Sequence, residues 1–214
     1  MNGETSIVTD AHIFRLLVAC NETRYPRRNK VIVLLAFEAG LTPLEISWLK
    51  RYAVETDGST VGSHIDLSGK KGSNLIARKI PLSSTGHLRG ALLDHLHNTP
   101  GHLMDPVIVS ERAIDGGGAV KDPNEGPLSP MRPTSISYVV YKLCDKASIR
   151  INGIRDIRRS FMTMVSRAVR DDPVGNARDV QQICGHRSLE TTQRFMDADW
   201  EAQTRAIGSL FDRN

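Results

Sequence analysis

The sequence has few cysteines and no long apolar run, and each shortage excludes a class of protein. Among its 214 residues there are three cysteines, an odd number spread widely along the chain. This excludes a disulfide framework and indicates a reducing compartment, so we expect a cytoplasmic protein. The longest apolar run, 31–37, is far shorter than the about 20 residues that span a bilayer, so we expect no membrane partner.

Common site motifs are missing too. The histidines at 87, 95, 97 and 102 have no spacing typical of zinc ligands, and no Walker-type glycine loop or Gly-x-Ser-x-Gly segment is present. Nor does the N-terminus combine a charged flank with an apolar stretch, so we expect no secretory signal. These absences predict a chain without metal or cofactor.

The composition is enough to bury a core. Hydrophobic residues make up 40% and charged residues 24% of the chain, and its length suits one globular domain. We therefore expect a single domain over 1–214.

Positive charge is unevenly distributed. The whole chain carries +4, whereas 149–170 has six arginines and a single acid, Asp156, which gives +5. Charge runs are most often solvated helix faces, but such faces usually interleave both signs. This segment therefore favours an anionic partner.

Hydrophobic periodicity predicts a mostly α fold with a little β structure. Asp10 can cap a first helix, Pro26 separates it from a second helix over 28–39 that Gly40 ends, and Pro43 suits the first turn of a third helix over 44–50. Strands are expected at 61–67 and 75–82, with a lysine-bearing turn between them, and a long loop at 111–130. Further helices are expected at 84–97, 135–147, 156–169, 177–184, 189–195 and 200–211.

Four segments carry the most specific signal. They are Ala39-Gly-Leu-Thr-Pro-Leu-Glu-Ile46, Arg78-Lys-Ile-Pro-Leu82, Gly153-Ile-Arg-Asp-Ile-Arg-Arg-Ser-Phe161 and Val180-Gln-Gln-Ile-Cys-Gly-His-Arg-Ser-Leu-Glu-Thr-Thr-Gln-Arg-Phe195. In this order they resemble the tyrosine recombinases, also called phage integrases, over about 9–211. The resemblance implies the mostly α (α+β) fold of that family's catalytic domain, with a small antiparallel β-hairpin. The family's N-terminal core-binding domain has no counterpart in 1–214, so we expect it to be absent.

The resemblance also implies a chemistry. In this family a tyrosine hydroxyl attacks a DNA phosphodiester, two arginines hold the phosphate oxygens, and an acid protonates the leaving oxygen. Arg158 matches the second arginine, His186 the family's second histidine or tryptophan, and Lys71 or its neighbour Lys70 the general acid on the hairpin turn. A surface salt bridge is the plainer interpretation of Arg158, and a helix-capping or buried role that of His186.

Three matched positions are altered. Thr42 stands where the first arginine is expected, Arg155 where histidine or lysine is usual, and Phe195 where the tyrosine is expected, nine residues after His186. Phenylalanine has no hydroxyl, so strand cleavage is not expected.

The sequence therefore predicts a DNA-binding protein of this family, defective in cleavage, that regulates or assists recombination or integration. In a prokaryote we expect it to be associated with the nucleoid. Its predicted DNA contacts are Lys70, Lys71, Arg78, Arg155, Arg158, Arg159, His186 and Arg187. The alternatives are an active recombinase with an unusual or borrowed nucleophile, and a protein-interaction module that no longer binds DNA. Partners are double-stranded DNA and, through the helix at 200–211, an active recombinase or a second copy of the chain.

Overall fold

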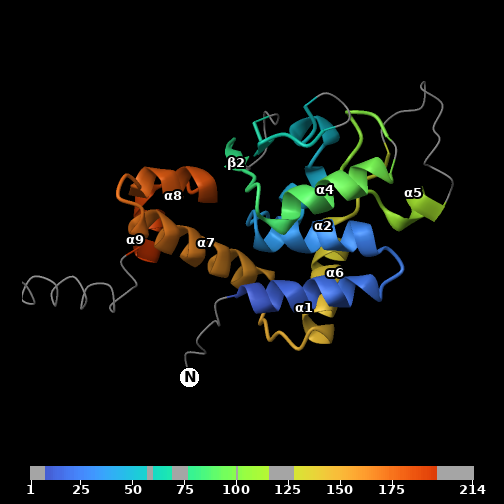
Figure 1. The fold of residues 1–214 in the computed structure, drawn as a ribbon, viewed down its shortest axis with the longest axis horizontal. Coiled ribbons are helices and arrows are strands. Elements are labelled where there is room, and N and C mark those ends of the chain that lie inside the picture. The colour runs from blue at the N-terminus through green and yellow to red at the C-terminus, as the bar shows by residue number, and fades with distance from the viewer. Residues whose placement is uncertain (1–7, 57–59, 69–76, 100, 116–127, 197–214) are drawn as a thin grey trace, which may run out of the picture. The chain divides into compact units, whose positions relative to one another are not determined.

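The described chain is mostly helical, with one small antiparallel sheet, as the sequence predicted (Figure 1). The structure is a computed structural model, and it describes residues 8–56, 60–68, 77–99, 101–115 and 128–196. It divides into two compact units, Met1–Phe161 and Met162–Asn214, with the boundary inside helix α7, Ile154–Asp171. No change in the hydrophobic pattern marks this boundary.

The first two helices differ slightly from the prediction at their N-termini. Helix α1, Asp10–Asn21, is capped by Thr9 and not by Asp10, which lies in the first turn. Helix α2, Pro26–Phe37, begins at Pro26, two residues earlier than predicted. Proline suits this place because the first helical residue has no partner for its N–H in any case.

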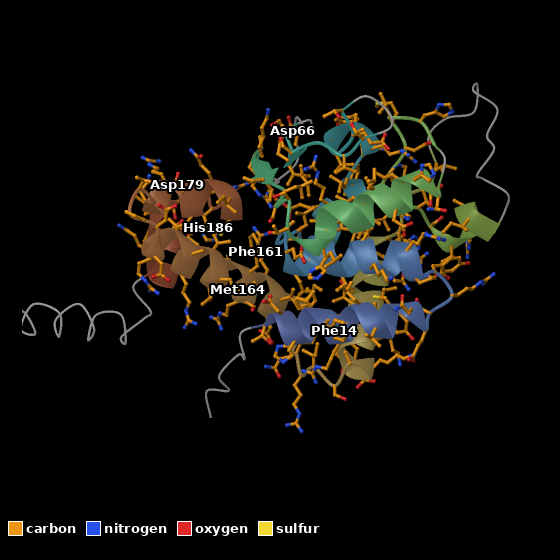
Figure 2. All side chains as sticks on the ribbon, in the orientation of Figure 1. Phe14, Asp66, Phe161, Met164, Asp179 and His186 are labelled. Carbon is orange, nitrogen blue, oxygen red and sulfur yellow. The ribbon has the colours of Figure 1, made fainter. Side chains whose placement is uncertain are left out.

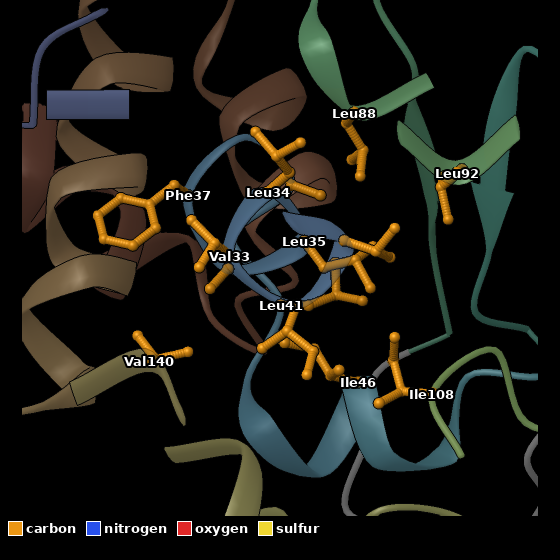
Figure 3. Packing of buried hydrophobic residues seen from close by; sticks show 14 of the residues in the cluster. Val33, Leu34, Leu35, Phe37, Leu41, Ile46, Leu88, Leu92, Ile108 and Val140 are labelled. Atoms are coloured by element: carbon orange, nitrogen blue, oxygen red, sulfur yellow. The ribbon is translucent and has the colours of Figure 1, made fainter. Parts of the chain in front are cut away.

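Helix α2 is the centre of the first unit's core. Its residues 31–37 are at most 2% exposed, and the helix packs against α1, α4 and α6. Figure 3 shows Leu34, Leu35 and Phe37 surrounded by side chains of other elements, Leu88 and Val140 among them. An apolar run without a polar face thus forms a helix that is covered on all sides.

Helix α2 ends at Phe37, two residues before the predicted end, and Gly40 follows in the turn and not directly after the helix. The φ of Gly40 is +61°, a conformation that side chains with a Cβ rarely adopt. The ring of Phe161 lies where a Cβ would be, with its Cε1 2.5 Å from that position. Glycine is therefore required both by the backbone and by the close approach of α7.

The next elements bring the chain to the sheet. Helix α3, Pro43–Trp48, and the short 3-10 helix η1, Arg51–Ala53, precede β1, His64–Asp66, which pairs antiparallel with β2, Lys79–Pro81. The strands are shorter than predicted, and only the central pair, Ile65 and Ile80, is buried. Residues 69–76 of the predicted hairpin lie outside the described residues.

Helix α4, His87–His97, follows, and then α5, Glu111–Asp115, which replaces the start of the predicted loop. The loop prediction was wrong at 111–115. The side chain of Glu111 pairs with Arg28 of α2 across 83 residues of sequence, at 3.0 Å. Because α5 is held by a partner so distant in the sequence, no local sequence pattern predicts it.

Helix α6, Pro133–Lys146, completes the first unit with the start of α7. The second unit continues α7 into α8, Ala177–Cys184, and α9, Leu189–Met196. The bounds of α8 match the prediction because both ends are encoded locally. Asn176 accepts from the Arg178 N–H at 2.9 Å, and Gly185 ends the helix at φ +67°.

The helix predicted at 200–211 lies outside the described residues. Across the part of the chain that is described, every helix is too short or too polar to cross a bilayer.

Candidate nucleic-acid interface

Thr42 and Glu45 form a closed pair at the start of α3. The Glu45 carboxylate accepts from the Thr42 N–H at 2.8 Å and from its hydroxyl at 2.9 Å, while the Glu45 N–H donates to that hydroxyl oxygen at 3.2 Å. This reciprocal capping box explains why the helix begins here. It also uses the proton of the Thr42 hydroxyl, so Thr42 has no donor left for a phosphate oxygen.

The second oxygen of Glu45 holds Arg78, the residue directly before strand β2. Arg78 Nη1 lies 2.5 Å from Glu45 Oε1, and both side chains are 4% exposed. The sequence predicted Arg78 as a DNA contact, and that role stays a prediction. Its burial leaves little guanidinium surface for a phosphate, and the contact with Glu45 makes it a partner of the capping box.

Arg158 of α7 reaches the same carboxylate. Its Nη1 donates to the Gly40 carbonyl oxygen at 2.5 Å and lies 3.6 Å from Glu45 Oε2. The side chain is 23% exposed, so part of the guanidinium remains accessible. We name Thr42, Glu45, Arg78 and Arg158 the Glu45 cluster. Its residues come from three of the four segments that resemble the tyrosine recombinases.

The two arginines keep the Glu45 carboxylate ionised. Burial alone would raise the pKa of Glu45, but the hydrogen bond and charge of Arg78, the Thr42 N–H and the charge of Arg158 together lower it. The buried Glu45 carboxylate therefore holds both guanidinium groups in place.

A contact with Val8 also fixes the orientation of α7. The Ser160 hydroxyl accepts a hydrogen bond from the Val8 N–H at 2.7 Å, and Ile157 and Phe161 on the same side of the helix are buried. This packing turns Arg155 and Arg159, which are four residues apart and share one side of the helix, to the surface next to Arg158. The first turns of α7 thus have a buried apolar side and an exposed cationic one.

His186 belongs to the second unit and follows Gly185 (Figure 2). Its Nδ1 lies 2.9 Å from the hydroxyl of Thr192, which is fully buried, and its Nε2 lies 2.9 Å from the Met162 sulfur. The ring is half-buried and oriented by α9 and α7. A phosphate contact of His186 stays a prediction, and it would require one ring nitrogen to exchange its present neighbour. Arg187, beside it, is exposed.

Three of the predicted site residues have no described side chain. Lys70 and Lys71 lie outside the described residues, and of Phe195 only the place in helix α9 is described. Among the described residues, no three histidine, cysteine or carboxylate side chains cluster in a way that could hold a metal ion.

The sequence did not predict Glu45 as a site residue, although Glu45 lies in the first of the four resembling segments. The signal was the Thr-Pro-x-Glu pattern, which is a capping box with proline at the first helical position. The pattern predicts the cap, but not that the carboxylate's other oxygen holds Arg78, which lies 33 residues away, directly before β2.

Solved structures with the same fold were found. XerA recombinase superposes with a TM-score of 0.66 at 22% identity, over 98% of this chain and 65% of that one. XerH site-specific recombinase bound to a palindromic difH substrate has a TM-score of 0.67 at 16% identity, over 99% and 55%. Tn1549 transposon integrase in complex with circular intermediate DNA has a TM-score of 0.63 at 15% identity, over 98% and 68%.

The sequence itself matches no protein-family model and no curated protein. The chain spans 65% and 55% of the lengths of the XerA and XerH proteins. At 14–22% identity these likenesses concern the fold. The fold that the four sequence segments predicted is therefore confirmed, and the chain has the fold of the tyrosine recombinases and integrases.

Proposed function

We propose that this chain is a tyrosine-recombinase relative that binds duplex DNA and does not cleave it. The observation that carries the proposal is the cationic side of α7, where Arg155 and Arg159 are exposed beside an Arg158 anchored to Gly40 and Glu45. Arginine suits phosphate because its planar fork donates paired hydrogen bonds. The DNA in the XerH and Tn1549 structures supports this choice of partner.

Two losses support the absence of cleavage. Phe195 has no hydroxyl to attack a phosphodiester. Thr42 cannot replace the charge of an arginine, and its hydroxyl already donates to Glu45. Binding without cleavage suits a regulator of recombination or integration, or a helper beside an active recombinase. Such binding is mainly to phosphates and independent of base sequence.

Salt-dependent binding to a duplex of random sequence tests the proposal. The R155A/R159A double variant should bind more weakly, and the slope of log K against log salt should flatten by about 2, since each phosphate contact contributes about 1. The R15A/K142A variant removes the same charge from exposed positions on α1 and α6 and should keep the wild-type slope.

If R155A/R159A and the wild-type protein bind equally in low salt, the cationic side of α7 is not the interface. If neither binds at all, the chain is the protein-interaction module considered above.

The predicted helix at 200–211 is proposed to dock onto a second copy of the chain or onto an active recombinase. Truncation after Asp199 tests this. Docking onto another chain predicts that DNA complexes lose their higher-order bands in gel shifts while the midpoint of thermal unfolding is kept. A destabilised or aggregating truncation instead indicates that the helix packs on its own chain.

A further inference from the structure

A cavity of about 250 Å³ lies at the N-terminus of α2, within the first unit. It is lined by residues at the start of α2, at the C-terminal end of α4 and on the segments around α5: Arg24, Tyr25, Pro26, Arg27, Arg28, His95, Asn98, Thr99, Val109, Ala113, Ile114 and Leu128. None of these residues belongs to the Glu45 cluster or to the exposed arginines of α7. Neither the recombinase fold nor the proposed DNA contacts therefore explain why this cavity exists.

Arg28 is the unusual member of this wall. The residue is 3% exposed, and it donates from Nε and Nη2 to Asn29 and from Nη2 to Glu111. Its Nη1 is buried and meets no hydrogen-bond acceptor among the described residues. Buried donors are nearly always satisfied, so an unmet guanidinium N–H on a cavity wall points to an acceptor that occupies the cavity.

The surroundings indicate the charge of that acceptor. The Arg28 guanidinium lies 4.4 Å from the centre of the Tyr25 ring, and that of Arg24 lies 5.2 Å from the same centre. Arg27 is held beside them by both oxygens of Asp94, at 3.1 and 3.2 Å. The positive end of the α2 dipole lies at the same place and favours an anion, while Asp94 and Glu111 already pair with Arg27 and Arg28.

The apolar residues of the lining indicate the chemistry of the rest of the ligand. Val109 and Leu128 are buried at 3% and 7% exposure but do not belong to the main core cluster, and Ile114 lies beside them on the cavity. A dry apolar cavity of about 150 Å³ is enough to hold benzene, so this one has room for a ring or branched chain in addition to an anionic group.

We propose that this cavity is a binding site for a small organic acid, whose carboxylate accepts from Arg28 Nη1 and whose apolar part packs on Val109, Ile114 and Leu128. The site is separate from DNA binding. A measurement without DNA therefore tests it whatever the outcome for the cationic side of α7.

Three small molecules distinguish the contributions of the two walls. Benzoate has both features, benzamide has the ring without the charge, and inorganic phosphate has the charge without the ring. We expect benzoate at ten times its dissociation constant to raise the midpoint of thermal unfolding by about 3–6 °C. Benzamide and phosphate should bind about tenfold more weakly or worse. In NMR spectra benzoate should shift the ring resonances of Tyr25 and His95, which line the cavity, and leave those of His64 in place.

Three variants, one of them a control, locate the binding site without removing the buried Arg28 network. Ile114→Trp fills the cavity and should abolish the benzoate effect, whereas Val174→Trp adds the same side chain at a position 84% exposed and should keep it. Arg24→Gln removes an exposed charge from the rim and should weaken benzoate binding several-fold.

Three results would overturn the proposal. Equal binding of benzamide and benzoate means that the arginines do not recognise charge, and phosphate binding as tight as benzoate means that the apolar wall takes no part. A failure of benzoate to bind, with Tyr25 and His95 resonances unchanged, means that the cavity is not a ligand site.

Discussion

Glu45 is the residue on which the arrangement of Arg78 and Arg158 depends. It caps α3 with one oxygen and holds Arg78 with the other, while Arg158 approaches the first. A buried carboxylate between two guanidinium groups fixes both of them, but it leaves uncompensated charge if it is removed.

Replacement of Glu45 by glutamine should therefore destabilise the protein by about 3–5 kcal/mol, because Arg78 would remain buried without its anion. Urea unfolding measures the change. Glu190→Gln is the matched control, since Glu190 and Arg194 are 71% and 76% exposed and their pair should contribute less than about 0.5 kcal/mol. Equal effects of the two variants would show that burial of the Glu45 cluster is unimportant.

The same carboxylate predicts a pH dependence. The pKa of Glu45 lies below its ordinary value of 4.5 in the folded chain, so the folded chain binds fewer protons there than the unfolded chain. Its contribution to stability is complete above pH 4.5 and is lost as the pH falls through the lower, folded pKa. The urea midpoint of the wild-type protein should thus fall more steeply below pH 4.5 than that of Glu45→Gln. Parallel curves would contradict this.

Gly40→Ala tests the packing of α7 against the turn after α2. The change should cost about 2 kcal/mol or more, because alanine is strained at φ +61° and its Cβ would overlap the Phe161 ring. Gly90→Ala is the control: Gly90 lies on the exposed side of α4 with nothing within 4 Å of the added Cβ, and alanine there should stabilise by about 0.5–1 kcal/mol. Thermal unfolding of both variants gives the comparison.

At the scale of elements, α9 orients His186 through a single hydroxyl. Thr192 is fully buried and lies 2.9 Å from His186 Nδ1, whereas its neighbour Thr191 is exposed and contacts Ser188. The two threonines differ in burial and partner but not in chemistry, so they form a matched pair.

Thr192→Val should cost about 1–3 kcal/mol, since it leaves the half-buried His186 nitrogen without its partner, and it should change the His186 ring resonances in NMR spectra. Thr191→Val should change neither by a comparable amount. If the two variants behave alike, the Thr192 hydroxyl does not hold the ring.

At the scale of the whole molecule, the prediction concerns the absence of cleavage. The wild-type chain should form no covalent adduct with nicked suicide DNA, because Phe195 cannot attack and the tyrosines lie elsewhere, at 25, 52, 138 and 141. Denaturing gels and mass spectrometry detect such an adduct. An adduct that maps to any of these tyrosines would establish an active recombinase with an unusual nucleophile.

The sequence alone determined the fold class and most of the helices. The reason is that these features are encoded locally. The apolar run at 31–37 predicted a buried helix, and Asn176 and Gly185 fixed both ends of α8. Four short segments in order were enough to predict the fold that the solved structures share with this chain.

Tertiary structure decided how the matched residues are used. It showed Arg78 buried against Glu45, the Thr42 hydroxyl already bonded, and α5 held by Arg28. These contacts join residues 33 and 83 positions apart, or turn a local cap toward a distant strand. Local patterns specify which residues form a helix or its cap, but the partner of a buried charge is selected by the packing of distant elements, and no local pattern contains it.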